Sequence, residues 1–538
     1  MMQAPMSRPN ILLVITDQHR ADHLGCYGNP IVRTPSIDRL AARGWSADRF
    51  YVSSPICMPN RSTLMTGRMP SLHGVRHNGI PLSLDLTTFP EVLRAHGYRT
   101  ALIGKSHLQN MTGFPALTPG PDQTAGPTSP PYALREARHR GDDAASYEQE
   151  NPDRWRDPKH RMALPFYGFE HVALCINHGD LVEGEYGRWL RSKLPNADDL
   201  RGEQGSEPTP EIVAPQAWRT RIPEAFYPTS YVANETIAWL ERHAARTDRA
   251  PFFLQCSFPD PHHPFTPPGR YWSMYDAADV ALSPSFHSAG VKPPPHVEAL
   301  RRERDEGVGE KRGQAVFACT EREAREATAL TYGMIAMIDD AVGRVLERLG
   351  ELGQADETVV IFTSDHGDFM GDHQLMLKGP LHYQGLIRTP FIWFDPQAPA
   401  TGRRDSLLAG TIDIASTVLD RAGLDGFNGM QGRSLLPAIS GERTPERTVF
   451  LVEEEAQRVQ MGFTERARVR TLLTERHRLS VYAGVPWGEL YDLVDDPHEL
   501  VNRWADPDFL ELRADLSFEL AQATIAMSET SPHPTNRA

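Results

Sequence analysis

The sequence predicts an α/β fold: a doubly wound, mostly parallel sheet flanked by helices, with a smaller C-terminal antiparallel sheet plus helix. Short, continuously apolar runs alternate with helical patterns along most of the chain, which is typical of a parallel sheet covered on both faces. Each apolar run leads directly into an unusual group of polar residues. Beyond residue 423, short strand patterns separated by turn residues replace this alternation.

Four apolar runs have the length expected of fully buried strands, and they span residues 11–16, 100–104, 251–258 and 358–364. The polar groups that follow them are Asp17-Gln18, Lys105-Ser106-His107, Asp260-Pro261-His262-His263 and Asp365-His366. Ligands of doubly wound sheets bind beyond the carboxyl ends of the strands. We therefore expect the four polar groups to meet at one edge of the sheet.

Helical patterns separate the predicted strands, at residues 34–44, 88–97, 229–245 and 321–349. Three stretches rich in Pro, Gly and charged residues interrupt the alternation, at 113–165, 195–225 and 283–315. Stretches of this length in a compact domain are either functional or poorly ordered, and we expect parts of the first two to form substrate-facing walls.

The chain of 538 residues is long enough for a large domain and a smaller one. We expect a catalytic α/β domain at residues 1–425 and an α+β subdomain at 426–538. The strands predicted for the subdomain lie at 448–453, 470–474, 477–482 and 489–492, and a helix at about 508–527 closes the chain.

Composition restricts the function classes. Charged residues make up 23% and hydrophobic residues 40%, as in a soluble globular protein, and the net charge of −14 argues against nucleic acid as a partner. No stretch of about 20 apolar residues predicts a membrane span. The N-terminus lacks the apolar region of a signal peptide, and the five cysteines form no closely spaced set. We therefore expect a cytoplasmic protein that does not associate with membranes.

Cys57 lies in a sequence context that favours a reactive residue. Pro59 suits the first turn of a helix and Gly67 the left-handed residue that ends one, so we expect Cys57 just ahead of a helix N-terminus. Unpaired backbone N–H groups there favour an anion, and Arg61 can fold back onto the same face. A lone cysteine is more often a small buried hydrophobe, but the spacing of Pro59 and Arg61 favours the functional interpretation.

The run Cys57-Met58-Pro59-Asn60-Arg61 resembles the C-x-P-x-R signature of the type I sulfatases, in the alkaline phosphatase superfamily. This resemblance implies that Cys57 is oxidised to formylglycine by a formylglycine-generating enzyme. The hydrated aldehyde is the catalytic nucleophile of that family. It also implies the predicted fold, because ordered blocks of the resemblance extend from residue 10 to residue 502.

A metal site is predicted at the ends of two strands. Asp17 and Asp365 offer hard oxygen ligands, although either residue alone is more often a turn or helix-capping residue. The segment 363–373, with Lys378 beyond it, also resembles the sulfatase pattern, and the resemblance implies one divalent metal held by Asp17, Gln18, modified Cys57, Asp365 and His366. Ca²⁺ is the expected ion, and the neutral amide of Gln18 with a nitrogen ligand makes Mn²⁺ the alternative.

The resemblance assigns roles to further polar residues. Lys105 and His107, in Gly104-Lys105-Ser106-His107-Leu108, match a sulfatase element in which the lysine bridges nucleophile and sulfate and the histidine deprotonates the diol. His262 and Lys378 match groups that bind the sulfate and protonate the leaving alcohol, and Arg61 holds the nucleophile. Without the family pattern, a lone lysine is usually a solvated surface charge.

The predicted function is therefore hydrolysis of a small-molecule sulfate monoester, as by an arylsulfatase. The alternative is a phosphonate monoester or phosphodiester hydrolase that uses the same nucleophile. Sulfatases carry two acidic residues where this chain has Asp17-Gln18, whereas Gln18, His366 and the substrate-binding Asn78 resemble phosphonate monoester hydrolases. A non-enzyme, which would bind anionic esters through unmodified Cys57, is a third hypothesis. The sequence leaves open whether the chain forms a homo-oligomer.

Overall fold

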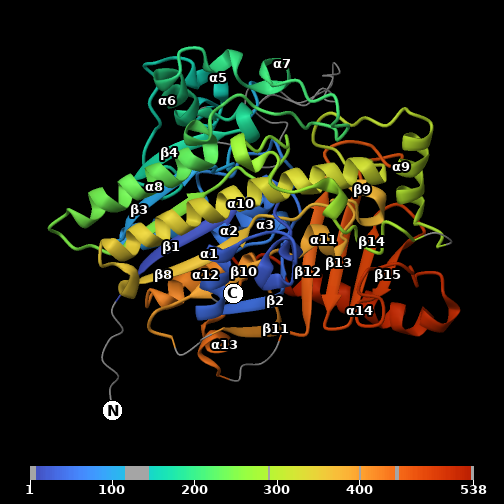
Figure 1. Cartoon of the computed structure of the whole chain (residues 1–538). Helices are drawn as coiled ribbons and strands as arrows, with labels where there is room; N and C mark the ends of the chain where they lie inside the picture. The colour runs from blue at the N-terminus through green and yellow to red at the C-terminus, as the bar shows by residue number, and fades with distance from the viewer. Residues whose placement is uncertain (1–7, 115–143, 289–290, 399–401, 443–446, 535–538) are drawn as a thin grey trace, which may run out of the picture.

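The larger of two main sheets forms the centre of the molecule, and the smaller follows near the C-terminus (Figure 1). A computed structural model describes residues 8–114, 144–288, 291–398, 402–442 and 447–534. Residues 115–143, which make up much of the first stretch expected to face the substrate, lie outside the described residues. The large sheet is mixed but mostly parallel, and the small one is antiparallel, which confirms the predicted fold class.

The large sheet has the strand order β11-β2-β10-β8-β1-β6-β3-β4-β5. Its strands are β1 (Asn10–Thr16), β2 (Trp45–Tyr51), β3 (Arg99–Gly104), β4 (His171–Ile176), β5 (Glu183–Gly184), β6 (Phe252–Ser257), β8 (Thr358–Ser364), β10 (Phe391–Phe394) and β11 (Arg403–Gly410). Four of them, β1, β3, β6 and β8, are the predicted apolar runs. The other five were not predicted.

The four predicted strands are direct neighbours, and their carboxyl ends are aligned. β1 pairs in parallel with β6 on one side and β8 on the other, and β6 pairs in parallel with β3. Thr16 lies opposite Ser364, and Gly104 lies opposite Ser257. The polar residues that follow these strands therefore meet at one edge of the sheet, as predicted.

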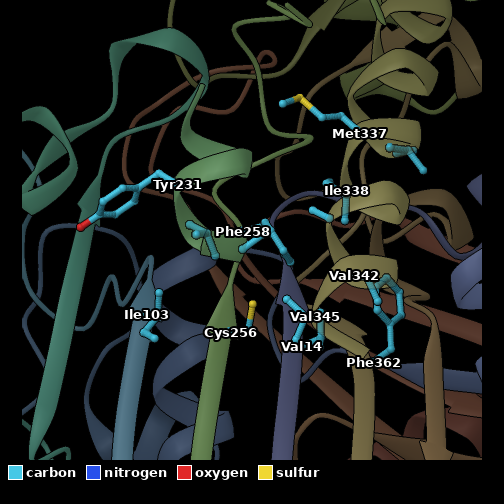
Figure 2. Packing of buried hydrophobic residues seen from close by; sticks show 14 of the residues in the cluster. Val14, Ile103, Tyr231, Cys256, Phe258, Met337, Ile338, Val342, Val345 and Phe362 are labelled. Atoms are coloured by element: carbon cyan, nitrogen blue, oxygen red, sulfur yellow. The ribbon is translucent and has the colours of Figure 1, made fainter. Parts of the chain in front are cut away.

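Two hydrophobic clusters cover the two faces of the large sheet. Leu12 and Val14 of β1 belong to one cluster, and Ile11 and Leu13 belong to the other, because successive strand residues point to opposite faces. Figure 2 shows Val14, Cys256 and Phe362 of three neighbouring strands packed beneath Val342 and Val345 of the long helix α10. The helices that contribute to these layers are α1 (Pro35–Arg43), α2 (Cys57–Thr66), α4 (Phe89–Ala95), α6 (Glu185–Lys193), α8 (Pro228–Ala244), α10 (Glu321–Glu351) and α12 (Ile412–Arg421).

The small sheet has the order β12-β13-β14-β15 and packs against the last helix, α14 (Figure 1). Its strands are β12 (Val449–Glu455), β13 (Arg468–Thr474), β14 (His477–Tyr482) and β15 (Gly488–Asp492), and the helix is α14 (Leu510–Ala526). One hydrophobic cluster joins this sheet to Tyr51, Leu386 and Ile387 of the larger part. The domain boundary after residue 425 remains our proposal. Among the described residues, no helix is both long and apolar enough to cross a membrane.

Gly104 ends β3 in a conformation that requires glycine, and it sets the position of Lys105. Its φ of 107° is left-handed, and a Cβ there would overlap the carbonyl oxygen of Ser257 on β6.

We expect Gly104→Ala to lower the free energy of unfolding by about 2–4 kcal/mol, through strain and overpacking, and to reduce activity. Denaturant unfolding measures this effect. Gly97→Ala is the control, because Gly97 also has a positive φ but an added Cβ would meet no neighbour within 4 Å. Equal losses in both variants would contradict the close approach of β3 and β6.

Candidate active site

The thiol of Cys57 lies at the centre of the polar edge. Cys57 is the first residue of α2, one position further into the helix than the sequence predicted, and it is 1% exposed. Its Sγ lies 3.0 Å from Nε2 of His366, 2.9 Å from Nζ of Lys378 and 4.0 Å from Oδ1 of Asp17. Burial opposes ionisation of the thiol, but the charges of Lys378, Lys105 and His366 together outweigh it, and the pKa of Cys57 lies below its usual value.

Arg61 connects the four strand ends. Its guanidinium donates to Asp365 at 2.7 Å and to Asp17 at 3.1 Å. It also donates at 3.1 Å to the carbonyl of Lys105 and to the hydroxyl of Ser257. One turn of helix α2 separates Arg61 from Cys57, so the guanidinium fixes helix α2 to β1, β3, β6 and β8 at once.

Asp17, Cys57, Asp365 and His366 form a buried group that fits a metal ion. Their ligand atoms all lie within 4.8 Å of one another. Nδ1 of His366 is 2.8 Å from the carbonyl oxygen of Gly367, so Nδ1 carries the proton and Nε2 presents a lone pair to the group. Two carboxylates, an imidazole nitrogen and a fourth donor in a buried position suit one divalent cation.

Gln18 reaches the same group, but its side chain has other partners. Its Nε2 donates to Asp368 at 2.5 Å, and its Oε1 accepts from Nζ of Lys378 at 3.0 Å. Lys378 also lies 3.0 Å from Nε2 of His262 and 3.1 Å from that of His366. The amide of Gln18 thus holds the lysine against the thiol, and its assignment as a metal ligand stays a prediction.

Lys105 is a second buried lysine of the site, and it contacts a residue that the sequence analysis missed. Its ammonium forms a short contact with Asp17 and lies 2.6 Å from Nε2 of His178. The ring of His178 stacks on that of His262, with centroids 3.5 Å apart. A signal for His178 existed, because it follows the apolar residues of β4 as the other polar groups follow their strands.

His107 is held in place by its backbone. Its φ is 57°, and Glu150 accepts hydrogen bonds from the amides of His107, Leu108 and Gln109. Nδ1 of His107 has no partner among the described residues. Burial, with the charges of Lys105 and Arg61, holds its pKa well below 6.5, so the ring is neutral. Glu150 gave no signal, because it lies in an interrupting stretch of the sequence.

Lys378 and Asn78 lie on the wall of a small cavity that opens beside the thiol. Its other lining residues are Ile56, His77, Gln314, Ala315, Gly379, Glu454, Glu455, Ala456, Gln457, Arg458 and Gln460. Among the described residues, the stretches 113–165 and 195–225 contribute nothing to this cavity, whereas 283–315 contributes Gln314 and Ala315. The mouth is therefore built partly by the residues that follow β12.

Buried charges of both signs set the protonation states. Burial opposes ionisation of Asp17, but Lys105 and Arg61 hold its pKa well below its usual range. Burial likewise opposes a charge on Lys378, yet Cys57 and Asp17 raise its pKa, so it is an ammonium. Burial and the neighbouring His178 and Lys378 hold the pKa of His262 well below 6.5. The site thus combines carboxylates, ammonium groups and neutral imidazoles, which suits binding of an anionic ester and transfer of protons.

The chain matches two family models. Residues 9–424 match the model described as "Sulfatase", and residues 371–526 match "N-sulphoglucosamine sulphohydrolase, C-terminal". The chain is 28% identical to an arylsulfatase of Clostridium perfringens, over 92% of this chain and 90% of the relative. It is also 28% identical to a multifunctional alkaline phosphatase superfamily protein, PehA, of Trinickia caryophylli, over 98% of each.

A solved structure shares both the fold and part of the sequence. The phosphonate monoester hydrolase of Agrobacterium radiobacter superposes with a TM-score of 0.74 at 26% identity, covering 98% of this chain and 97% of the other. An arylsulfatase and a phosphonate monoester hydrolase are therefore each similar to nearly the whole chain.

We expect Asp365→Ala to weaken binding of the divalent cation at least about 100-fold, because it removes a charged ligand from the buried group. After dialysis, elemental analysis should find one equivalent of metal in the unaltered chain and less than about a tenth of an equivalent in the variant. Asp356→Ala is the control, because Asp356 is exposed and lies just ahead of the same strand, β8. A variant that lacks Asp365 but keeps one tightly held ion would contradict the metal group.

Proposed function

Because the chain belongs to the sulfatase family, we propose that it hydrolyses small sulfate monoesters with a nucleophile derived from Cys57. One observation carries this proposal. The thiol at the start of α2 is buried in contact with Lys378 and His366 and lies beside Asp17, in the group that fits a metal. A buried thiol with only a packing role would have apolar neighbours, like Cys256 in the sheet.

The family implies that the nucleophile is formylglycine, whose hydrate supplies an attacking hydroxyl in place of the thiol. Asp17, Cys57, Asp365 and His366 would hold one divalent cation, Ca²⁺ or alternatively Mn²⁺, which would stabilise negative charge as a Lewis acid. Arg61 keeps both carboxylates in place. The lowered pKa of Cys57 shows that this position favours a negative charge.

Two ammonium groups favour an anionic ester beside residue 57. Lys105 and Lys378 are both buried. Lys378 contacts the thiol of Cys57, and Lys105 contacts Asp17, which lies beside the thiol. A sulfate group that enters between them replaces some of these contacts with its own oxygens. Preorganised cations then stabilise the charge that develops on the oxygens during transfer.

Leaving-group protonation is best assigned to Lys378. Its Nζ carries a proton and lies 3.0 Å from Nε2 of His262, which is neutral and accepts from it. The lysine lines the mouth through which the alcohol would leave. His262 then acts by orienting the ammonium and by binding the ester.

His107 is suited to the base step that releases sulfate. A neutral ring with an unpartnered nitrogen can accept a proton, whereas an imidazolium cannot. Glu150 positions the ring through three backbone N–H groups, so the histidine reaches the site in a single orientation.

A second candidate function is hydrolysis of phosphonate monoesters or phosphodiesters. Gln18 supports it, because a neutral amide occupies the place of the second acidic residue of sulfatases. Asn78 also supports it, as does the likeness to the phosphonate monoester hydrolase of Agrobacterium radiobacter. Sulfate monoesters, phosphonate monoesters and phosphodiesters each carry one negative charge at neutral pH, so one set of cations can bind all three.

Cys57 should lose about 18 Da in active protein, the mass change from thiol to aldehyde. Activity should rise in proportion to the modified fraction, and Cys57→Ala should fold but lose essentially all turnover. Peptide mass spectrometry and kcat measured on fractions of different modification test this. Cys256→Ala is the matched control, because Cys256 is equally buried but packs in the hydrophobic core. Fully unmodified protein with undiminished kcat would refute the assigned nucleophile.

Sulfate monoesters should be better substrates than phosphonate monoesters with the same leaving group. Lys105 and His107 would provide the sulfatase arrangement for charge stabilisation and release. The contact of Lys105 with Asp17 and the hydrogen bond from the His107 amide to Glu150 support this assignment. The test is the ratio of kcat/KM for an aryl sulfate and an aryl phosphonate carrying one phenol. A ratio well below one would assign the chain to the second candidate function.

A further inference from the structure

A second polar cavity, of about 440 Å³, lies between the large sheet and the C-terminal residues. Its wall includes Arg20, Arg49 and Arg388 and, from the C-terminal part, Glu475 and Glu499. It shares no lining residue with the mouth beside Cys57, and none of the residues assigned to catalysis or metal binding lines it. Its volume is within the range of about 300–1,000 Å³ that is typical of small-molecule sites.

Two arginines on this wall have weak partners. Arg388 is half-buried, and the hydrogen bond of its guanidinium is a 3.5 Å contact with the carbonyl of Asp48. Arg49 meets only Glu475, at 3.5 Å, whose side chain is 81% exposed. For both arginines, these are the side-chain partners found among the described residues. Arg49 and Tyr51 are two apart on β2, and Arg388 bridges to Tyr51, so both arginines project from one face.

The carboxylates of the cavity already have cationic partners. Asp22 and Asp372 both accept from Arg20 at 2.7 Å. Glu499 accepts from Arg478, which is fully buried on the C-terminal side. Among the described residues, Arg388 forms no ion pair, and the only carboxylate paired with Arg49 is that of Glu475.

We propose that this cavity binds a small oxyanion, held by the guanidinium groups of Arg49 and Arg388. Arginine pairs recognise the planar or tetrahedral oxygens of carboxylate, phosphate and sulfate. The cavity is large enough for a metabolite that carries such a group. Titrations with inorganic sulfate, inorganic phosphate and acetate, each added alone, show which of the three oxyanions the cavity binds.

The site lies behind the loop that carries two of the metal-binding residues. Nη1 of Arg20 donates to the carbonyl oxygens of Asp368 and Phe369 at 2.9 and 2.7 Å. The amide of Asp368 donates to the carbonyl of Gly385, next to Gln384. An anion bound here touches groups on the far side of this loop from Cys57, so it does not compete with substrate for space.

The experiment measures anion stoichiometry in the full chain. Equilibrium dialysis should give two bound anions for the unaltered chain and one for Arg49→Gln/Arg388→Gln, whose remaining anion occupies the site at Cys57. Lys378→Ala should instead lose the anion at the Cys57 site and keep the anion in this cavity. Arg33→Gln is the control, because Arg33 is exposed and does not line the cavity. Each lost charged contact should weaken binding about tenfold.

Crystals soaked with selenate, an anomalous scatterer shaped like sulfate, locate the second anion directly. A peak within hydrogen-bond distance of Arg49 and Arg388 supports the proposal. A cavity that stays empty while the site at Cys57 is filled overturns it, as does unchanged stoichiometry in the double arginine variant. Basal kcat/KM of that variant should stay within about twofold of the unaltered chain, so failure here is separable from failure of the proposed function.

Discussion

The guanidinium of Arg61 is the interaction on which the rest of the site depends. It joins carboxylates that lie 348 positions apart in the chain, Asp17 and Asp365, and it bonds the ends of two further strands. Both carboxylates are fully buried, and a buried charge without a partner costs several kcal/mol, on the order of 3–5 when one partner of a pair is removed. The cation therefore makes it feasible to hold two anions side by side in the interior, and it does so from the helix that begins at the nucleophile.

Local electrostatics, rather than net charge, makes this edge receptive to anions. The chain carries a net charge of −14, which repels an anionic ester at long range. Beside Cys57, however, Lys105 and Lys378 are held within contact of acidic or thiol groups and away from water. Neutral histidines fill the spaces between these cations, because burial and like charges suppress their protonation. In the proposed function, Lys378 both binds the ester and protonates the leaving group, whereas the neutral His107 takes the base step.

The sequence predicted four apolar strands and the polar side chains that follow them, because strand burial and strand ends leave a recognisable pattern, but it missed β4 and β10, which are just as apolar. It missed β2 and β11, whose polar positions pair with each other across the sheet edge, as Asp48 does with Arg404. It also missed Glu150, whose role lies in backbone hydrogen bonds that no motif records. The direction of the Gln18 amide could not be predicted, since Asp368 and Lys378 compete for it only in three dimensions. The family resemblance located the nucleophile, whereas its burial and neighbours required the structure.

The order of strands in the sheet also determines how long β1 waits for its neighbouring strands while the chain is synthesised. β1 is among the first segments made, yet its two neighbours are β6, which starts at residue 252, and β8, which ends at residue 364. Both edges of β1 stay unpaired until those segments emerge, and the pocket around Cys57 stays open as long. At about 5–20 residues per second, the 307 residues from position 57 to position 364 take on the order of 15 to 60 seconds to make. During this interval the thiol, which is almost completely buried in the folded chain, is accessible to a macromolecular catalyst.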